Sequence, residues 1–171
     1  MIVILAGLPA SGKTTLAREL AQRTAGTVLN KDEIRRTLFD AQDVEYSTEQ
    51  DDLCMRVLFD TATYLLTKHP ARKIFIDGRP FSRRSQIDDA LDLARKLRQP
   101  WRILECICSE ASARRRLRDS AGEPHPARNR NLELYANLRA GWEEIAAPKT
   151  VIDTDEPFEQ CIEQAMRAIS E

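Results

Sequence analysis

The sequence contains only four cysteines, and no two of them have the C-x-x-C spacing of zinc-binding or redox pairs. Neither of its two histidines lies close enough to a cysteine to complete a zinc site. Cys106 and Cys108 lie two positions apart in an apolar segment, so we expect them to share one face of a strand and to pack as small apolar side chains. The cysteines therefore predict neither a metal site nor a disulfide framework.

Long hydrophobic runs are also missing. The apolar start Met1–Ala6 is far shorter than the roughly 18 residues of a membrane span, and no basic segment precedes it. We therefore expect a cytoplasmic protein of one domain, with no membrane partner.

An excess of positive charge is absent, because 26 Lys and Arg residues stand against 27 Asp and Glu residues. This balance does not suggest a protein that coats long nucleic acids. The charges are unevenly placed, however: residues 40–60 contain seven acids and one base, and residues 113–130 contain six arginines and two acids. Such blocks are usually solvated helix faces, and we treat the arginine block as a candidate exception.

The strongest motif present is Gly7-Leu8-Pro9-Ala10-Ser11-Gly12-Lys13-Thr14, which matches the phosphate-binding pattern G-x-x-x-x-G-K-[ST] directly after an apolar run. Glycines at both ends let the backbone curl so that its N–H groups face phosphate oxygens at the start of a helix. The lysine is expected to reach the β- and γ-phosphates of ATP, and the first threonine to offer its hydroxyl to Mg²⁺. The predicted nucleotide-binding residues are Gly7, Pro9, Ala10, Ser11, Gly12, Lys13, Thr14 and Thr15.

Short apolar runs alternate with helix-period segments along the chain, which is typical of an α/β fold with a five-stranded parallel sheet and helices on both faces. The expected strands are Met1–Ala6, Thr27–Leu29, Lys73–Asp77, Arg102–Cys108 and Thr150–Ile152. The expected helices are 12–24, 32–39, 48–67, 83–98, 110–119, 130–146 and 156–169. In such sheets ligands bind beyond the C-terminal ends of the strands, so the residues that follow the strands are candidate site residues.

Asp32 follows the second expected strand, and Arg35 lies three residues further on, on the same helical face. An aspartate at this place can accept the proton of an attacking hydroxyl. The simpler alternative is that Asp32 only caps the helix. Asn30 is an equally good cap, so capping does not single out Asp32, and we expect Asp32 and Arg35 to be catalytic and to contact the substrate.

Lys73-Ile-Phe-Ile-Asp77 resembles the buried strand that ends in a magnesium-binding acid, so Asp77 and Thr14 are the predicted metal-binding residues. The loop that follows contains Arg79 and Arg83, which could hold a phosphate or carboxylate of the substrate. For Arg83, a helix start with a surface charge is an almost equal alternative.

The arginine block lies on an expected helix and continues into a loop rich in glycine and proline. A lid over about residues 114–130 would close on the phosphates and exclude water. We predict Arg116 and Arg118 as catalytic, although positions two apart point to nearly opposite sides of a helix. His125 and Arg128 are predicted substrate contacts, with plain loop residues as the alternative.

Together, the phosphate loop, the Asp32-x-x-Arg35 element, Asp77 and the arginine helix resemble a group of small P-loop kinases. The group comprises zeta toxin, chloramphenicol phosphotransferase and the kinase domain of polynucleotide 5′-hydroxyl kinases. In the polynucleotide kinases the aspartate is the general base and the arginine contacts the acceptor and the scissile phosphate, which implies these roles for Asp32 and Arg35. Their lid arginines would correspond to residues among Arg114, Arg116 and Arg118.

Two departures from the motifs of related kinases argue against a nucleic acid, gluconate or adenylylsulfate as the acceptor. Polynucleotide kinases have Asp-Thr-Asn where this chain has Asp77-Gly78-Arg79, and gluconate and adenylylsulfate kinases have Asp-x-Asp where it has Asn30-Lys31-Asp32. The chain also resembles bacterial kinase-like proteins that have Asp-Gly-Arg-x-Phe-Ser after the third strand. This resemblance does not identify an acceptor.

We therefore expect a monomeric or homodimeric kinase that uses ATP and Mg²⁺ to phosphorylate a hydroxyl acceptor, with a small molecule favoured over an RNA or DNA 5′ end. A nucleotide-dependent switch or ATPase module is the alternative from another class. The chain lacks the extra helical domain such machines use.

Overall fold

The computed structural model describes residues 1–119 and 131–170. Its centre is one five-stranded parallel sheet with the strand order β2-β3-β1-β4-β5, which confirms the predicted fold class. The strands are β1 (Ile2–Ala6), β2 (Thr27–Asn30), β3 (Ile74–Asp77), β4 (Trp101–Ile107) and β5 (Thr150–Asp153). Each lies within one or two residues of its predicted position.

Strands β1 and β3 are buried at every residue. Helices on both faces remove them from water, so an unbroken apolar sequence is stable there. The only charged residue of these two strands is Asp77, at the C-terminal end of β3.

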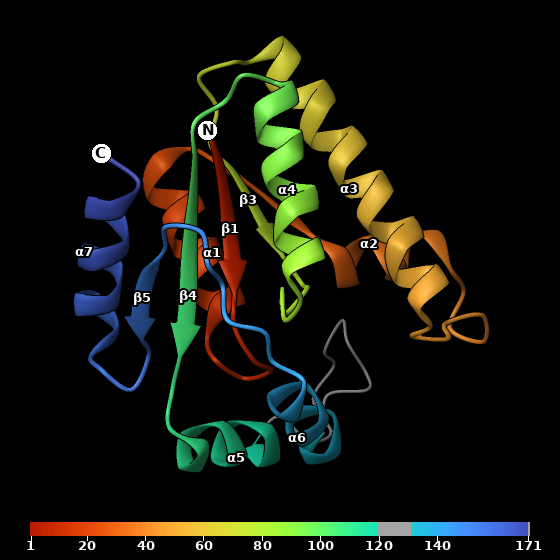
Figure 1. Ribbon diagram of the computed structural model, residues 1–171, viewed down its shortest axis with the longest axis vertical. Helices are drawn as coiled ribbons and strands as arrows, with labels where there is room; N and C mark the ends of the chain where they lie inside the picture. The colour runs from red at the N-terminus through yellow and green to blue at the C-terminus, as the bar shows by residue number, and fades with distance from the viewer. Residues whose placement is uncertain (120–130, 171) are drawn as a thin grey trace.

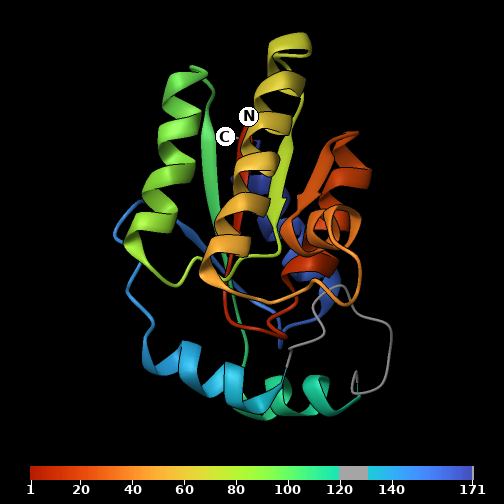
Figure 2. The same ribbon diagram turned by 90° about the vertical axis from the view of Figure 1, so that its right-hand side faces the viewer.

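Helices cover both faces of the sheet (Figures 1 and 2). Helices α1 and α7 pack on one face around Val3 and Leu5, and α3 and α4 pack on the other around Ile2 and Ile4. Helices α5 and α6 lie beyond the C-terminal ends of the strands (Figure 1). The helices are α1 (Lys13–Thr24), α2 (Lys31–Leu38), α3 (Thr48–Lys68), α4 (Arg84–Lys96), α5 (Glu110–Asp119), α6 (Leu132–Ala140) and α7 (Phe158–Ala168).

The prediction of one helix over residues 130–146 was wrong at its C-terminal end, because α6 ends at Ala140. Gly141 follows as the cap, and the next residues turn back to the sheet instead of continuing the helix. The Glu143 N–H donates to the Ser82 carbonyl at 2.9 Å, and Ile145 is buried in the core. These tertiary contacts outweigh the local helical tendency of the sequence.

Among the described residues, no helix is both long and apolar enough to cross a membrane.

Candidate active site

The phosphate loop connects β1 to α1, and its backbone needs glycine at both ends. Gly7 has a φ of 141° and Gly12 a φ of 85°, both in the region that side chains disfavour. A Cβ atom on Gly7 would lie 2.3 Å from the carbonyl oxygen of Cys106 in β4. Ala10, between them, also has a positive φ of 64°. The loop is therefore curled, as the motif predicts, and packs directly on the neighbouring strand.

Lys13 begins α1 and bends back across the loop. Its Nζ atom donates to the carbonyl oxygens of Gly7 at 2.8 Å and Leu8 at 2.7 Å. Ser11, whose hydroxyl is 3.3 Å from the same nitrogen, is buried, whereas the side chain of Thr15 is exposed on α1. The ammonium group thus lies over the concave side of the loop, where positive charge and helix N-terminus attract phosphate.

The end of β3 brings Asp77 to the phosphate loop. Its Oδ2 atom accepts hydrogen bonds from the Thr14 hydroxyl at 2.7 Å and from the Asn30 amide at 2.6 Å. Its Oδ1 atom is buried and has no hydrogen-bond partner among the described residues. A buried carboxylate oxygen beside a threonine hydroxyl is the hard oxygen donor set that Mg²⁺ prefers, so Asp77 and Thr14 fit a magnesium site.

Asn30, not Asp32, caps α2. The Asn30 Oδ1 atom accepts from the N–H groups of Asp32 at 2.9 Å and Glu33 at 3.1 Å. The alternative that Asp32 is only a cap is therefore excluded. Gly78 packs against this cap with a φ of 88°, and a Cβ atom on it would lie 2.7 Å from the Lys31 nitrogen. This close contact fixes the start of α2 against the end of β3.

Asp32 belongs to a network of charged side chains between α2 and α3. Arg35, which is 1% exposed, donates to Asp32 at 2.9 Å and also binds Asp51 of α3. Lys31 donates to the same Asp51 oxygen at 2.9 Å. The Arg35 guanidinium also lies 4.9 Å from the centroid of the Tyr46 ring, within the range of a cation–π interaction.

Three members of this network, Lys31, Tyr46 and Asp51, were not identified as site residues from the sequence. Asp51 belongs to the acidic run that sequence analysis describes as a solvated face. No motif spacing links it to Arg35, because the contact forms only when α3 folds back on α2.

The burial of Lys31 has an electrostatic consequence. Desolvation, with smaller contributions from Arg35 and Arg79, lowers the pKa of its ammonium group to about 8 against the opposing effect of Asp32. Lys31 therefore loses its charge near pH 8, well below the pH at which lysine ordinarily does.

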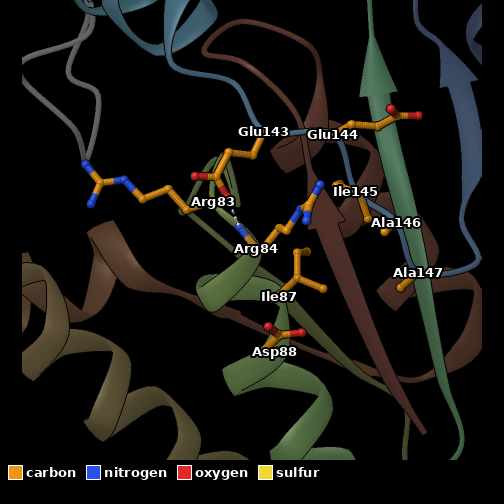
Figure 3. A pocket seen from close by; sticks show the side chains of 9 residues that line it. All are labelled: Arg83, Arg84, Ile87, Asp88, Glu143, Glu144, Ile145, Ala146 and Ala147. Atoms are coloured by element: carbon orange, nitrogen blue, oxygen red, sulfur yellow. Dashed lines mark hydrogen bonds between the residues drawn. The ribbon is translucent and has the colours of Figure 1, made fainter.

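Arg79 and Arg83 follow β3 but have different surroundings. Arg79 is buried and its guanidinium lies 3.1 Å from Asp52 of α3, next to the network around Arg35. Arg83 is exposed at the N-terminus of α4, and its side chain points away from that of Arg84 (Figure 3). The Glu143 carboxylate accepts from the Arg84 N–H at 2.7 Å and so caps α4 (Figure 3). The structure thus brings Arg79, but not Arg83, against the charged network.

Of the two candidate arginines on α5, Arg116 faces the phosphate loop. Its guanidinium donates to the Ala10 carbonyl at 3.1 Å and to the hydroxyl and carbonyl of Thr154 at 2.9 and 2.7 Å. Arg118 is exposed. Thr154, which sequence reasoning missed, also donates to the Ser11 carbonyl at 3.1 Å. The loop after β5 therefore joins Arg116 to the phosphate loop.

Asp155 anchors the start of α5 near Arg116. Hydrogen bonds from Ser109 and Ser112, together with Arg116, lower the pKa of its carboxyl group to about 2. Asp155 is therefore ionised at neutral pH. The predicted substrate contacts His125 and Arg128, and most of the predicted lid loop, lie outside the described residues.

Comparisons with known proteins agree with this fold. Residues 2–145 match the model of a family described as an AAA domain. A comparison with curated proteins gave no match.

Solved structures resemble the whole chain. Adenylylsulfate (APS) kinase of Mycobacterium tuberculosis in complex with AMPPNP and APS has a TM-score of 0.73 at 17% identity, covering 99% of this chain and 97% of that one. Kti12 of Chaetomium thermophilum in complex with ADP-AlF3 has a TM-score of 0.72 at 17% identity, covering 100% of both chains. A sugar kinase of Janibacter has a TM-score of 0.70 at 20% identity, covering 99% of this chain and 94% of that one. At these identities the likeness shows the fold, which is of the P-loop NTPase type.

Proposed function

This chain belongs to the AAA domain family, whose model matches residues 2–145, and from this we propose that it is an ATP-dependent phosphotransferase. In this proposal the γ-phosphate of ATP moves to a hydroxyl group of an acceptor. In this proposal the phosphate loop of the P-loop kinase-like fold binds the nucleotide, and the charged network between α2 and α3 binds the acceptor.

The observation that carries the proposal is the junction of three elements at Asp77. The phosphate loop, the end of β3 and the cap of α2 meet there through the Thr14–Asp77 and Asn30–Asp77 hydrogen bonds. Phosphoryl transfer needs phosphate, metal and acceptor groups in one place, because catalysis rests on positioning and charge stabilisation. Mg²⁺ held at Thr14 and Asp77 would neutralise charge on the β- and γ-phosphates.

Asp32 is the proposed general base. Its backbone N–H donates to Asn30, the cap residue that contacts Asp77, so Asp32 begins α2 close to the proposed metal site. Arg35 holds its Oδ1 atom at 2.9 Å, which leaves the second carboxylate oxygen to accept the hydroxyl proton. Arg35 is itself oriented by Asp51, and the buried Nε atoms of Arg35 and Arg79 have no hydrogen-bond partner among the described residues.

Arg116 is the proposed phosphate-stabilising arginine. Its contacts with Ala10 and Thr154 place a guanidinium beside the phosphate loop, where charge on the transferring group develops. Arg118 and Arg83 remain predictions without a supporting contact among the described residues, and His125 and Arg128 remain predictions outside them.

A small-molecule acceptor is favoured over a polynucleotide end. Two of the similar structures are named for a sugar and for APS, both small molecules. The basic side chains near Asp32 are paired with Asp51 and Asp52, so they offer little unpaired charge to a polyanion.

A nucleotide-dependent switch is the second candidate. It needs the same nucleotide site, and the similar structure of Kti12 is a complex with ADP-AlF3. An ATPase activity that needs no acceptor and rises with a protein partner would favour it. ATP consumption that begins only when one hydroxyl compound is added would favour the kinase.

The decisive experiment is a transfer screen with γ-labelled ATP over nucleosides, sugars, aminoglycosides and RNA oligomers, run with the natural chain and with Lys13→Ala. We expect label in one class of acceptor with the natural chain and none with Lys13→Ala, since Lys13 is the cation of the phosphate loop. Lys68→Ala, on the last turn of α3, is the matched control and should transfer label normally.

Circular dichroism must show that Lys13→Ala is folded. Transfer by a folded Lys13→Ala protein at the natural rate would contradict the phosphate-loop assignment. Label released only as inorganic phosphate, with every acceptor, would contradict the transferase.

A further inference from the structure

A cavity of about 320 Å³ lies beside the phosphate loop and has no role in the mechanism above. It is bordered by the start of the loop, the C-terminal end of β4, the first turn of α5, helix α6 and Trp142. Its lining includes Leu8, Glu105, Cys108, Tyr135, Arg139 and Trp142. The volume is at the lower end of the range of about 300–1,000 Å³ for small-molecule pockets.

The cavity and the proposed metal site lie on opposite sides of the sheet. Glu105 shares the face of β4 with Ile103, which packs in the core under α3 and α4. Asp77 shares the face of β3 with Phe75, which packs in the core under α1. The phosphate loop crosses between these faces, so the cavity touches the loop from the side away from α1.

The lining is mostly apolar and its charges are paired. Tyr135 is buried and Trp142 is half-buried, so two aromatic rings border the space. Glu105 is 8% exposed and forms a 2.8 Å ion pair with Lys149 through its Oε2 atom. Arg139, at the other end, is paired with Glu110. An anionic ligand would lie against the buried Glu105 carboxylate, which disfavours it relative to a neutral ligand. The Arg139–Glu110 pair is exposed and adds little to this selection.

We propose that this cavity holds the body of the phosphate acceptor, and that the acceptor is an uncharged molecule with an apolar or aromatic ring and a hydrogen-bond donor directed at Glu105. The inference rests on the proposed phosphotransfer. The acceptor hydroxyl must reach the γ-phosphate held at the phosphate loop. The cavity borders that loop at Gly7, Leu8 and Ser11.

The span between cavity and base suits a small molecule. The proposed base, Asp32, follows β2, and β2 and β4 are separated by β3 and β1, which makes three strand spacings or about 14 Å. A molecule of two or three rings covers that length. A polynucleotide end does not fit, because it needs an open groove with unpaired basic side chains.

Binding is tested without turnover through Trp142, which becomes the only tryptophan when Trp101 is replaced by phenylalanine. Trp101 begins β4, at the end of the strand far from the cavity. The probe is para-nitrobenzyl alcohol, a neutral ring-bearing alcohol whose nitroaryl group quenches tryptophan fluorescence. Para-nitrobenzoate, which has the same ring and a negative charge, is the control probe.

We expect saturable quenching by the alcohol and only the linear collisional quenching of a free tryptophan derivative by the benzoate. Cys108→Phe places a ring in the cavity and should raise the Kd of the alcohol by about tenfold or more, since the ring occupies the space in which the probe buries its apolar area. If Cys108→Phe does not fold, Cys108→Leu makes the same test with a smaller side chain. Val151→Phe, which adds the same ring on the exposed edge strand, should leave the binding unchanged.

Quenching that does not saturate, equal saturation by both probes, or alcohol binding unaffected by a folded Cys108 variant would overturn the inference. An acceptor that takes label in the transfer screen should displace the alcohol. Transfer to a compound that does not displace it would overturn the cavity assignment and leave the kinase proposal intact. Normal probe binding by a chain that transfers no label would contradict the kinase proposal instead.

Discussion

At the scale of single residues, Asn30 and Asp32 have separate tasks although they lie two positions apart. Asn30 caps α2 and contacts Asp77, and Asp32 only pairs with Arg35 and Lys31. Asp32→Asn therefore keeps the cap and keeps an acceptor oxygen for Arg35, but removes the base. We expect a folded protein whose kcat falls by roughly 10²-fold or more, measured with the acceptor from the transfer screen.

The matched variant is Asn30→Ala. It leaves the base but removes both the cap and the buried hydrogen bond to Asp77, so the free energy of unfolding should fall by about 1–3 kcal/mol. A kcat that survives Asp32→Asn would show that Asp32 only orients Arg35.

Arg116 and Arg118 form a natural pair for the same kind of comparison. Arg116 contacts the Ala10 carbonyl of the phosphate loop, and Arg118 is exposed on the same helix. If Arg116 stabilises charge in the transition state, Arg116→Ala should lower kcat by about tenfold or more while the KM for ATP changes little. Arg118→Ala should change both constants by less than about twofold. Equal small losses from both variants would reduce the arginine block to a solvated helix face.

At the scale of elements, the junction between β3 and α2 is the tightest contact of the site. Gly78 has a φ of 88° and leaves no space for a Cβ atom beside the Lys31 nitrogen and the Asn30 side chain. Gly78→Ala should therefore lower the free energy of unfolding by about 1–3 kcal/mol. It should also move the start of α2, so kcat should fall together with stability in thermal melts and transfer assays.

Gly141→Ala is the control for that variant. The backbone at Gly141 has a φ of −99°, and the nearest atom to an added Cβ lies at 3.6 Å. Its Tm should stay close to that of the natural chain. A Gly78→Ala protein as stable as Gly141→Ala would mean that α2 shifts without cost, and the position of Asp32 would then not depend on this contact.

At the scale of the whole molecule, the phosphate loop contacts the loop after β3, the end of β4 and helix α5. Gly7 donates to the Pro80 carbonyl at 3.0 Å and touches Cys106, and Ala10 accepts from Arg116. A ligand that binds this loop therefore stabilises the fold as a unit. At about 100 times its Kd, ATP should add about 2.7 kcal/mol to the free energy of unfolding and raise the Tm by several degrees.

Lys13→Ala separates this effect from nonspecific salt stabilisation. Its own Tm should change little, but ATP should no longer raise it. An equal rise with sodium triphosphate in both proteins would show that the shift comes from ionic strength and not from the loop.

The sequence by itself determined the nucleotide side of this protein. The spacing of Gly7, Gly12, Lys13 and Thr14 requires one loop geometry, because only glycine adopts its backbone angles and the lysine and threonine then face the same point. The five strands and their alternation with helices also follow from local patterns, since apolar runs and helical periods are properties of neighbouring residues.

The tertiary structure alone decided the side of the site that we propose for the acceptor. Asp51 and Tyr46 reach Arg35 only because α3 packs on α2, and Thr154 reaches Arg116 only because the loop after β5 lies beside α5. The end of α6 was mistaken for the same reason, as Glu143 and Ile145 gain more from contact with the sheet than from another helical turn. Contacts between residues far apart in the chain carry no spacing signal, so a single sequence cannot show them.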